Sequence, residues 1–269
     1  MSLRQPSPSS NRQFLLGGAV PVHRIAFGAM RLTGQPGNWG PYADWEAGIR
    51  LLRRSVDLGV NLIDTARSYG AGWNEKLIAD ALAPYPPGLV IATKGGIEKV
   101  APGQVKVDGR PQTLRKHVEE ALVQLRTERI DLFQLHRPDP TVPLEESIGA
   151  LAQLQAQGKL RWIGVSNVDL HQLEAARRVA TITSVQNRCN QFDAPDEAVL
   201  AYCQREGIAY LPHGPLAAHA HVAGAPIVQA GGSATSALRW LLERAPNVIV
   251  IPGTTSLAHL EENMNAWAT

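Results

Sequence analysis

The chain has 269 residues, of which 44% are hydrophobic and 19% are charged, and its formal net charge is +2. This composition is typical of a folded globular protein, and so weak a charge balance, without a long run of Lys or Arg, argues against nucleic acid as a partner. No apolar run approaches the length of a membrane span and no signal peptide is seen, so we expect a cytoplasmic protein without a membrane partner.

The N-terminal part of the chain predicts a disordered segment and then a hairpin. Residues 1–13 are polar and rich in Ser and Pro, so we expect them to be disordered. Phe14–Leu16 and Val20–Val22 are short apolar runs on either side of Gly17-Gly18, a pair that favours a tight turn between two strands. Residues 14–269 are expected to form a single domain.

A regular alternation of strands and helices fills the rest of the chain. Eight short apolar runs predict strands at Arg24–Met30, Asn61–Ala66, Leu89–Lys94, Ile130–His136, Leu160–Asn167, Ser184–Asn190, Ala209–Pro215 and Val248–Thr254. Helical patterns follow them at Asp44–Leu58, Asn74–Leu82, Thr113–Arg126, Leu144–Gln157, Asp169–Val179, Pro195–Arg205, Ser236–Arg244 and Leu257–Trp267. Strands that are apolar almost throughout are typical of parallel strands covered by helices.

Eight strand–helix units predict an α/β protein with a closed (β/α)8 TIM barrel. The alternative is an open, doubly wound sheet. Such a sheet would normally carry a Gly-rich phosphate loop after its first strand, and the first strand here ends in FGAMRLTG, without a GxGxxG motif. The sequence therefore favours the barrel.

Polar side chains stand where five successive strands end, although buried strands should stay apolar. They include Asp64, Lys94, His136, Asn167 and Gln186. One such residue would be an ordinary structural group. Because burying polar and charged groups without a purpose is costly, and because the carboxyl ends of barrel strands meet at one rim where active sites lie, the set predicts a functional site.

Four residues of this rim suit the reduction of a carbonyl group, which needs a proton donor for the developing alkoxide. Tyr69 can donate that proton, and an adjacent Lys94 would lower the tyrosine pKa by favouring the phenolate. Asp64 would keep Lys94 charged and placed, and a neutral His136 would polarise the carbonyl oxygen. A metal bound by Asp64 and His136 is the alternative, but Lys94 would repel a cation, so no metal is expected.

Segments along nearly the whole chain resemble the aldo-keto reductase family. The matching segments are FGAMRLTG, GVNLIDTARSYG, IATKGG, RIDLFQLHRPDP, LQAQGKLRWIGVSN, SVQNRCNQFD, LPHGPLA and IPGTTSLAHLEENM. The resemblance implies the family's TIM barrel, with the N-terminal hairpin closing its bottom and a nicotinamide cofactor extended across its top. By position, Asp64, Tyr69, Lys94 and His136 correspond to the catalytic residues of the family.

The resemblance also implies which residues hold the cofactor. Ser166, Asn167 and Gln186 match the groups that hold the nicotinamide carboxamide, and His213 stands where the family usually stacks an aromatic ring. The remaining cofactor positions are Pro215 and Leu216 beside the pyrophosphate, Gly253, Thr254, Thr255 and His259 after the last strand, and Glu262 and Asn263 at the adenine edge.

The cofactor preference is the main departure from the family pattern. The family often places Lys or Arg in the segment after the last strand, where they select the 2′-phosphate, and this chain has Thr254, Thr255, Ser256 and His259. Hydroxyl groups and a helix N-terminus can still bind a phosphate. NADP(H) is therefore favoured, and NAD(H) is expected to bind as well.

Within the family the chain looks most similar to the pyridoxal reductase-like branch, so the implied partner is a small carbonyl substrate such as pyridoxal. The alternative function is a nicotinamide-binding sensor or regulatory subunit with little turnover. No motif indicates an oligomeric state.

Overall fold

The computed structural model describes residues 12–193, 196–217 and 226–267. Residues 1–11, most of the segment predicted to be disordered, lie outside the described residues. The hairpin is present: β1 (Gln13–Leu16) pairs antiparallel with β2 (Val20–His23). Gln13 is paired with His23, and the Arg12 carbonyl oxygen accepts from the Arg24 N–H at 2.9 Å.

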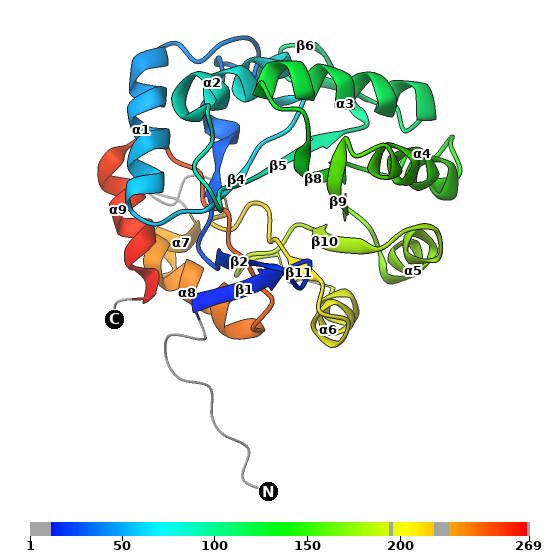
Figure 1. Cartoon of the computed structure of the whole chain (residues 1–269). Coiled ribbons are helices and arrows are strands. Elements are labelled where there is room, and N and C mark those ends of the chain that lie inside the picture. The colour runs from blue at the N-terminus through cyan, green and yellow to red at the C-terminus, as the bar shows by residue number, and fades with distance from the viewer. Residues whose placement is uncertain (1–11, 194–195, 218–225, 268–269) are drawn as a thin grey trace, which may run out of the picture.

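A parallel sheet curls around the centre of the molecule (Figure 1). Among the described residues it has seven strands, in the order β3 (Phe27–Gly28), β4 (Leu62–Asp64), β5 (Val90–Gly95), β8 (Ile130–Leu135), β9 (Leu160–Ser166), β10 (Ile182–Gln186) and β11 (Ala209–Tyr210). Its order follows the chain, as in a barrel, and the predicted α/β barrel fold is confirmed.

The predicted eighth strand is reduced to single bridges that close the barrel. Val248 pairs in parallel with Tyr210, and Val250 pairs in parallel with Ile25 on the other side. Pro252 has no N–H to donate, so the predicted strand over Val248–Thr254 cannot continue its ladder there.

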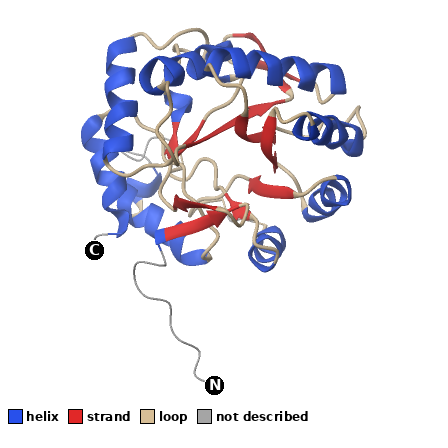
Figure 2. Cartoon of the chain, viewed as in Figure 1, coloured by secondary structure: helices blue, strands red, loops and turns tan. Residues whose placement is uncertain are grey.

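Helices cover the outside of the sheet, as the alternation predicts (Figure 2). They are α1 (Trp45–Asp57), α2 (Trp73–Leu82), α3 (Pro111–Leu125), α4 (Leu144–Ala156), α5 (Leu170–Val179), α6 (Glu197–Arg205), α7 (Pro226–Gln229), α8 (Ala234–Arg244) and α9 (Leu257–Met264). The side chains of Asp44 and Asp169 cap α1 and α5 by accepting backbone N–H groups. No described helix is long and apolar enough to cross a membrane.

Several short elements were not predicted. They are the antiparallel strands β6 (Ile97–Ala101) and β7 (Gln104–Val107), the 3-10 helices η2 (Ala29–Arg31) and η3 (Tyr69–Gly72), and the helix α7. The 3-10 helix η4 (Asn265–Trp267) ends the region predicted as the last helix. The hairpin and η3 both follow catalytic strands of the predicted rim.

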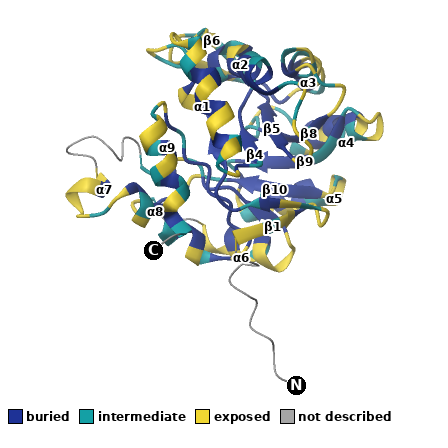
Figure 3. Ribbon diagram, turned by 60° about the vertical axis from the view of Figure 1, so that its left-hand side comes forward, coloured by how far each residue is buried: buried dark blue, intermediate teal, exposed yellow. Residues whose placement is uncertain are grey.

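The strands bury both faces, and this produces two apolar cores. Ile63 packs outward against the helices, whereas its neighbour Leu62 packs inward with Val90 and Ile249. Leu16 and Val22 of the hairpin join this inner cluster and are fully buried, so the hairpin closes the bottom of the barrel. Figure 3 shows the sheet buried and the outer helix faces exposed.

Arg24 stabilises the segment from Val248 to Gly253, which closes the barrel and is called the seam. Its buried guanidinium donates to the carbonyl oxygens of Val248 at 2.9 Å, Leu242 at 2.5 Å and Ala245 at 2.6 Å. It also lies 5.3 Å from the centre of the Trp267 ring. Burial lowers the pKa of Arg24 to about 10, so it remains charged at neutral pH.

We predict that Arg24→Met lowers the free energy of unfolding by about 3 kcal/mol, because three buried carbonyl groups lose their donors. Arg24→Lys keeps the charge but lacks the planar fork, and it should recover less than half of this loss. Urea denaturation followed by circular dichroism measures both variants. A change below about 1 kcal/mol in Arg24→Met would contradict this role.

Candidate active site

Three neighbouring strands bring the four predicted catalytic residues to one rim. Asp64 ends β4, Lys94 lies near the end of β5, and His136 directly follows β8. The sheet order β4–β5–β8 places these strands side by side. Tyr69 begins η3, the turn that follows β4, and therefore lies close to them.

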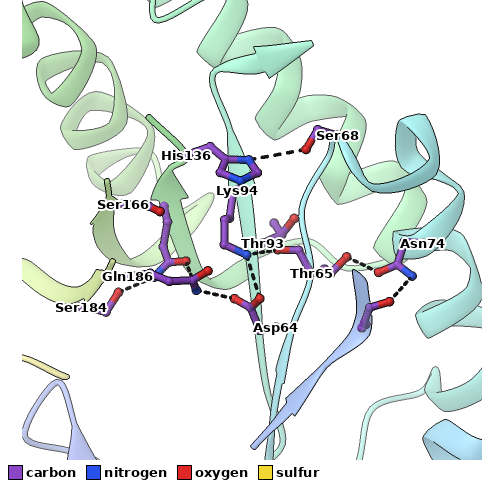
Figure 4. Close-up of polar contacts among 12 residues, drawn as sticks. Asp64, Thr65, Ser68, Asn74, Thr93, Lys94, His136, Ser166, Ser184 and Gln186 are labelled. Carbon is purple, nitrogen blue, oxygen red and sulfur yellow. Dashed lines mark hydrogen bonds and ion pairs between the residues drawn. The ribbon is translucent and has the colours of Figure 1, made fainter. Parts of the chain in front are cut away.

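Lys94 and Asp64 form a buried ion pair in the barrel (Figure 4). The ammonium nitrogen lies 2.8 Å from Asp64 Oδ2 and donates to the Thr65 carbonyl oxygen at 2.7 Å; the Lys94 and Asp64 side chains are 0% and 3% exposed. Burial alone would lower the pKa of Lys94, but the charge of Asp64 and the neighbouring Tyr69 raise it above its usual value. Lys94 is therefore positively charged.

Tyr69 lies above this pair, with the Lys94 ammonium nitrogen 5.1 Å from the centre of its ring. Desolvation raises the pKa of Tyr69, Lys94 lowers it and Asp64 raises it. Lys94 lowers the tyrosine pKa, as expected from the sequence, but desolvation outweighs Lys94 and the net shift is upward. The phenol is thus fully protonated at neutral pH.

His136 is a neutral group facing the same space. Its ring centre lies 6.0 Å from that of Tyr69, with the planes at 82°. Desolvation of the ring holds the pKa of His136 well below its usual value, and the positive charge of Lys94 lowers it further. The Ser68 hydroxyl oxygen lies 3.5 Å from Nδ1, and a hydroxyl that donates to Nδ1 leaves the proton on Nε2.

A chain of side-chain amides supports the ion pair from the opposite side. Gln186 donates through Nε2 to Asp64 Oδ1 at 2.8 Å and to Gln134 Oε1 at 3.2 Å, and Gln134 donates to Ser184 Oγ at 2.8 Å. Gln186, predicted to hold the nicotinamide carboxamide, thus also anchors Asp64. Its Oε1 accepts no hydrogen bond from the described residues.

Asn167 joins the next part of the rim to His136. It has a positive φ of 58° and donates to the His136 carbonyl oxygen at 2.9 Å and to Ser166 Oγ at 3.0 Å. His213 Nε2 lies 3.0 Å from Asn167 Oδ1. Burial lowers the pKa of His213 to about 4, so a neutral imidazole is bonded edge-on to Asn167.

The other predicted cofactor residues lie further along the same rim. Pro215 is buried, and Leu216 packs against the core. Thr254 accepts from the Ser256 N–H at 3.0 Å, and Ser256 accepts from the His259 N–H at 3.4 Å and so caps α9. Two of the three hydroxyl groups in this segment are therefore engaged locally, and Thr255 is exposed.

Two observations fit a nucleotide in this region. Both polar atoms of the Asn263 carboxamide are buried and have no hydrogen-bond partner within the described part of the chain, which is costly without a ligand. Gly28 and Gly253 approach so closely that a Cβ on Gly253 would lie 2.6 Å from the Gly28 carbonyl oxygen. No side chain therefore separates the backbone at Gly28 from the backbone at Gly253. Glu262 and Asn263 are neighbours on α9.

Sequence reasoning missed Ser68 and Gln134 as members of the site. Gln134 could have been found, because it lies two residues before His136 and so faces the same way on one strand. Ser68 carried no such signal, since its position beside His136 depends on the course of the turn between Asp64 and Tyr69.

The sequence pattern of the Aldo/keto reductase family matches residues 24–222. Pyridoxine 4-dehydrogenase of Escherichia coli is 39% identical over 268 residues, which cover 96% of this chain and 93% of that protein. A Schizosaccharomyces pombe protein named as an oxidoreductase is 40% identical over 255 residues, covering 93% and 83%.

Solved structures of the same kind superimpose on the fold. The glycerol dehydrogenase AKR11B4 from Gluconobacter oxydans has a TM-score of 0.84 at 28% identity, covering 95% of this chain and 90% of that one. An aldo/keto reductase from Klebsiella pneumoniae, solved with NADP and acetate, has a TM-score of 0.78 at 24% identity, covering 96% and 90%. The second similarity concerns the fold alone.

A buried carboxyl group lies directly behind the strand that carries Lys94. Glu75 on α2 is fully buried, and its Oε1 accepts from the Thr93 hydroxyl at 2.5 Å. Its Oε2 has no partner among the residues that the structure describes. Burial raises the pKa of Glu75 to about 7, and the Thr93 hydrogen bond opposes this only in part.

We predict that Glu75 makes stability fall as the pH rises. Its folded-state pKa of about 7 exceeds the usual 4.5, so the stability from the neutral carboxyl is complete below about pH 4.5 and is lost as the pH rises through 7. The free energy of unfolding of the wild type, relative to Glu75→Gln, should fall by up to about 3 kcal/mol between pH 5 and pH 8.

Urea denaturation at several pH values measures this difference. Glu119→Gln, which removes an exposed carboxylate on α3, is the control and should show no such slope. A constant difference between wild type and Glu75→Gln across this pH range would show that Glu75 is ionised throughout.

Proposed function

The chain belongs to the aldo/keto reductase family of oxidoreductases, and on this premise we propose that it reduces an aldehyde or ketone to an alcohol with NADPH, using Tyr69 as the proton donor. The observation that carries the proposal is the buried pair of Lys94 and Asp64 at 2.8 Å beneath Tyr69. A nicotinamide-binding sensor with little turnover would not need this arrangement.

Each of the four predicted catalytic side chains has a separate role in the proton transfer. The neutral His136 donates from Nε2 to the carbonyl oxygen and polarises it, and Tyr69 then transfers its phenolic proton to the same oxygen. Lys94 stabilises the phenolate that is left, and Asp64 keeps Lys94 charged and oriented. The raised pKa of Tyr69 keeps the donor protonated until the alkoxide develops.

The dinucleotide supplies the hydride when it is bound. Gln186 can accept from its carboxamide through the unused Oε1, with Ser166 and Asn167 beside it, and His213 borders the same place. Asn263 and Glu262 would hold the adenine, with Thr254, Thr255 and His259 near the ribose and its phosphate. Gly253, Pro215 and Leu216 line the course between the two ends.

An aromatic aldehyde such as pyridoxal is the substrate that we propose within this class. The 39% identity to pyridoxine 4-dehydrogenase over nearly the full length supports it. Two exposed aromatic side chains border the Tyr69 turn: Trp73 follows η3, and Trp39 lies in a loop that is tied to the turn by the Gly70 N–H donating to the Asn38 carbonyl oxygen. Such rings offer stacking surfaces to a pyridine ring.

We predict that Tyr69→Phe lowers kcat for NADPH-dependent reduction of pyridoxal by at least about 10²-fold, since only the proton donor is removed. NADPH binding, measured by tryptophan fluorescence, should be unchanged. Tyr202→Phe on the outer helix α6 is the control and should keep its turnover. Turnover of Tyr69→Phe close to that of the wild type would exclude Tyr69 as the donor, and no reduction of any aldehyde by the wild type would overturn the proposed function.

We also predict that NADPH binds more tightly than NADH but that NADH binds measurably, because neutral hydroxyl groups hold a 2′-phosphate less strongly than a cation does. Thr255→Arg should raise the ratio of the two affinities by about tenfold. Thr181→Arg adds the same charge at an exposed position before β10 and should leave the ratio unchanged. Tighter binding of NADH than NADPH would show that this segment is not a phosphate site.

A further inference from the structure

A polar cavity of about 190 Å³ lies outside the barrel, beside the turn that carries Tyr69. It is lined by Arg67 and Ala71 of this turn, by residues of β6 and by residues of α3, and none of the four catalytic residues lines it. Cavities of about 150 Å³ hold a molecule the size of benzene. The space is therefore large enough for a small organic molecule.

His117 on α3 lines this cavity, and its Nε2 makes no hydrogen bond to a described residue. Its side chain is buried, at 3% exposure, and its Nδ1 accepts from the Gly96 N–H at 3.1 Å. The proton of the neutral ring must then be on Nε2, and burial lowers the pKa of His117, which keeps the ring neutral. Glu98 Oε1 lies 3.7 Å from Nε2, beyond hydrogen-bond distance.

The charged side chains that line the cavity have a net charge of one positive unit, because three cations face two carboxylates. Arg67 pairs with Glu120 at 2.8 Å, and Lys116 lies 3.6 Å from Glu98. Lys99 on β6 has no ion pair with any described residue, and desolvation lowers its pKa. An ammonium group and an imidazole N–H, neither of which has a hydrogen-bond acceptor among the described residues, thus line one cavity that already contains two carboxylates paired with cations.

We propose that this cavity binds a small oxyanion, namely the carboxylate or phosphate group of a metabolite, through Lys99 and the Nε2–H of His117. An oxyanion supplies the several acceptor lone pairs that both donors lack, and charge-assisted hydrogen bonds to it are strong. Its negative charge balances the surplus positive charge on Lys99. The site is separate from the one that we propose for the reaction.

The bound group would act on the catalytic turn through Arg67. The Arg67 N–H donates to the Lys94 carbonyl oxygen at 2.9 Å, and Arg67 precedes Tyr69 by only two residues. Gly72 has a φ of 95°, and a Cβ there would lie 2.9 Å from the Arg67 guanidinium. Arg67 thus belongs both to the cavity wall and to the turn that carries Tyr69. A ligand in the cavity would stabilise the conformation of this turn.

The test is a titration of the full chain, labelled with ¹⁵N, followed through the side-chain nitrogen resonances of histidine. The probes are sodium phosphate and sodium acetate, each compared with sodium chloride at equal ionic strength. The His117 signal is identified by its loss in His117→Gln. We expect a saturable shift at Nε2 with a Kd of about 1 mM, by phosphate if the group is a phosphoryl and by acetate if it is a carboxylate.

Two variants make the result specific. Lys99→Met should weaken binding at least about tenfold, whereas Lys159→Met, which removes a lysine that does not line the cavity, should leave the Kd within about twofold. Shifts equal to those with chloride, no saturation by either anion, or equal effects of both variants would overturn the proposal. Because the readout is binding and not turnover, its failure would leave the proposed reductase activity untouched.

Discussion

The buried ion pair of Lys94 and Asp64 determines how the rest of the site is built. An ammonium group without water costs several kcal/mol unless a carboxylate and further acceptors surround it. Asp64 must therefore end the strand next to Lys94, and the Thr65 carbonyl oxygen must turn toward it. The second oxygen of Asp64 then needs its own donor, which Gln186 brings from β10 across the barrel.

Hydrogen bonds that cross the barrel make the site rigid before any ligand is bound. One chain runs from Ser184 through Gln134 and Gln186 to Asp64, and a second runs from His213 through Asn167 to the backbone of His136. Side chains that are already oriented need no rearrangement when charge develops on a substrate. The two histidines stay neutral, so the positive charge between them and Asp64 comes from Lys94.

Hydrophobic periodicity was enough to predict most of the fold, because each strand and helix buries an apolar face that repeats along the sequence. It could not predict the closing seam, where Val248 and Val250 make single bridges and Pro252 ends the pairing. The β6–β7 hairpin, with Pro102-Gly103 at its turn, carried a local signal that the strand–helix alternation concealed.

The candidate site was predictable as a set of residue types at strand ends, but its energetics were not. The position of Tyr69 relative to Lys94 depends on the turn between Asp64 and Tyr69, and the loss of water around the phenol decides the direction of its pKa shift. In the same way, the inward turn of Gln186 follows from Gln134, a contact between two strands that lie far apart in the sequence.

The seam divides the barrel into two parts of unequal strength. Strands β4 to β10 are joined by parallel ladders and carry the groups of the proton chemistry. The segment from Val248 to Gly253 is held by single bridges, by Arg24 and by the contact of two glycines. The residues proposed to hold the adenosine follow this weaker segment directly in the chain, from Thr254 to Asn263. Substitutions in this part of the barrel can therefore change the affinity for the cofactor without moving the residues of the proton chemistry.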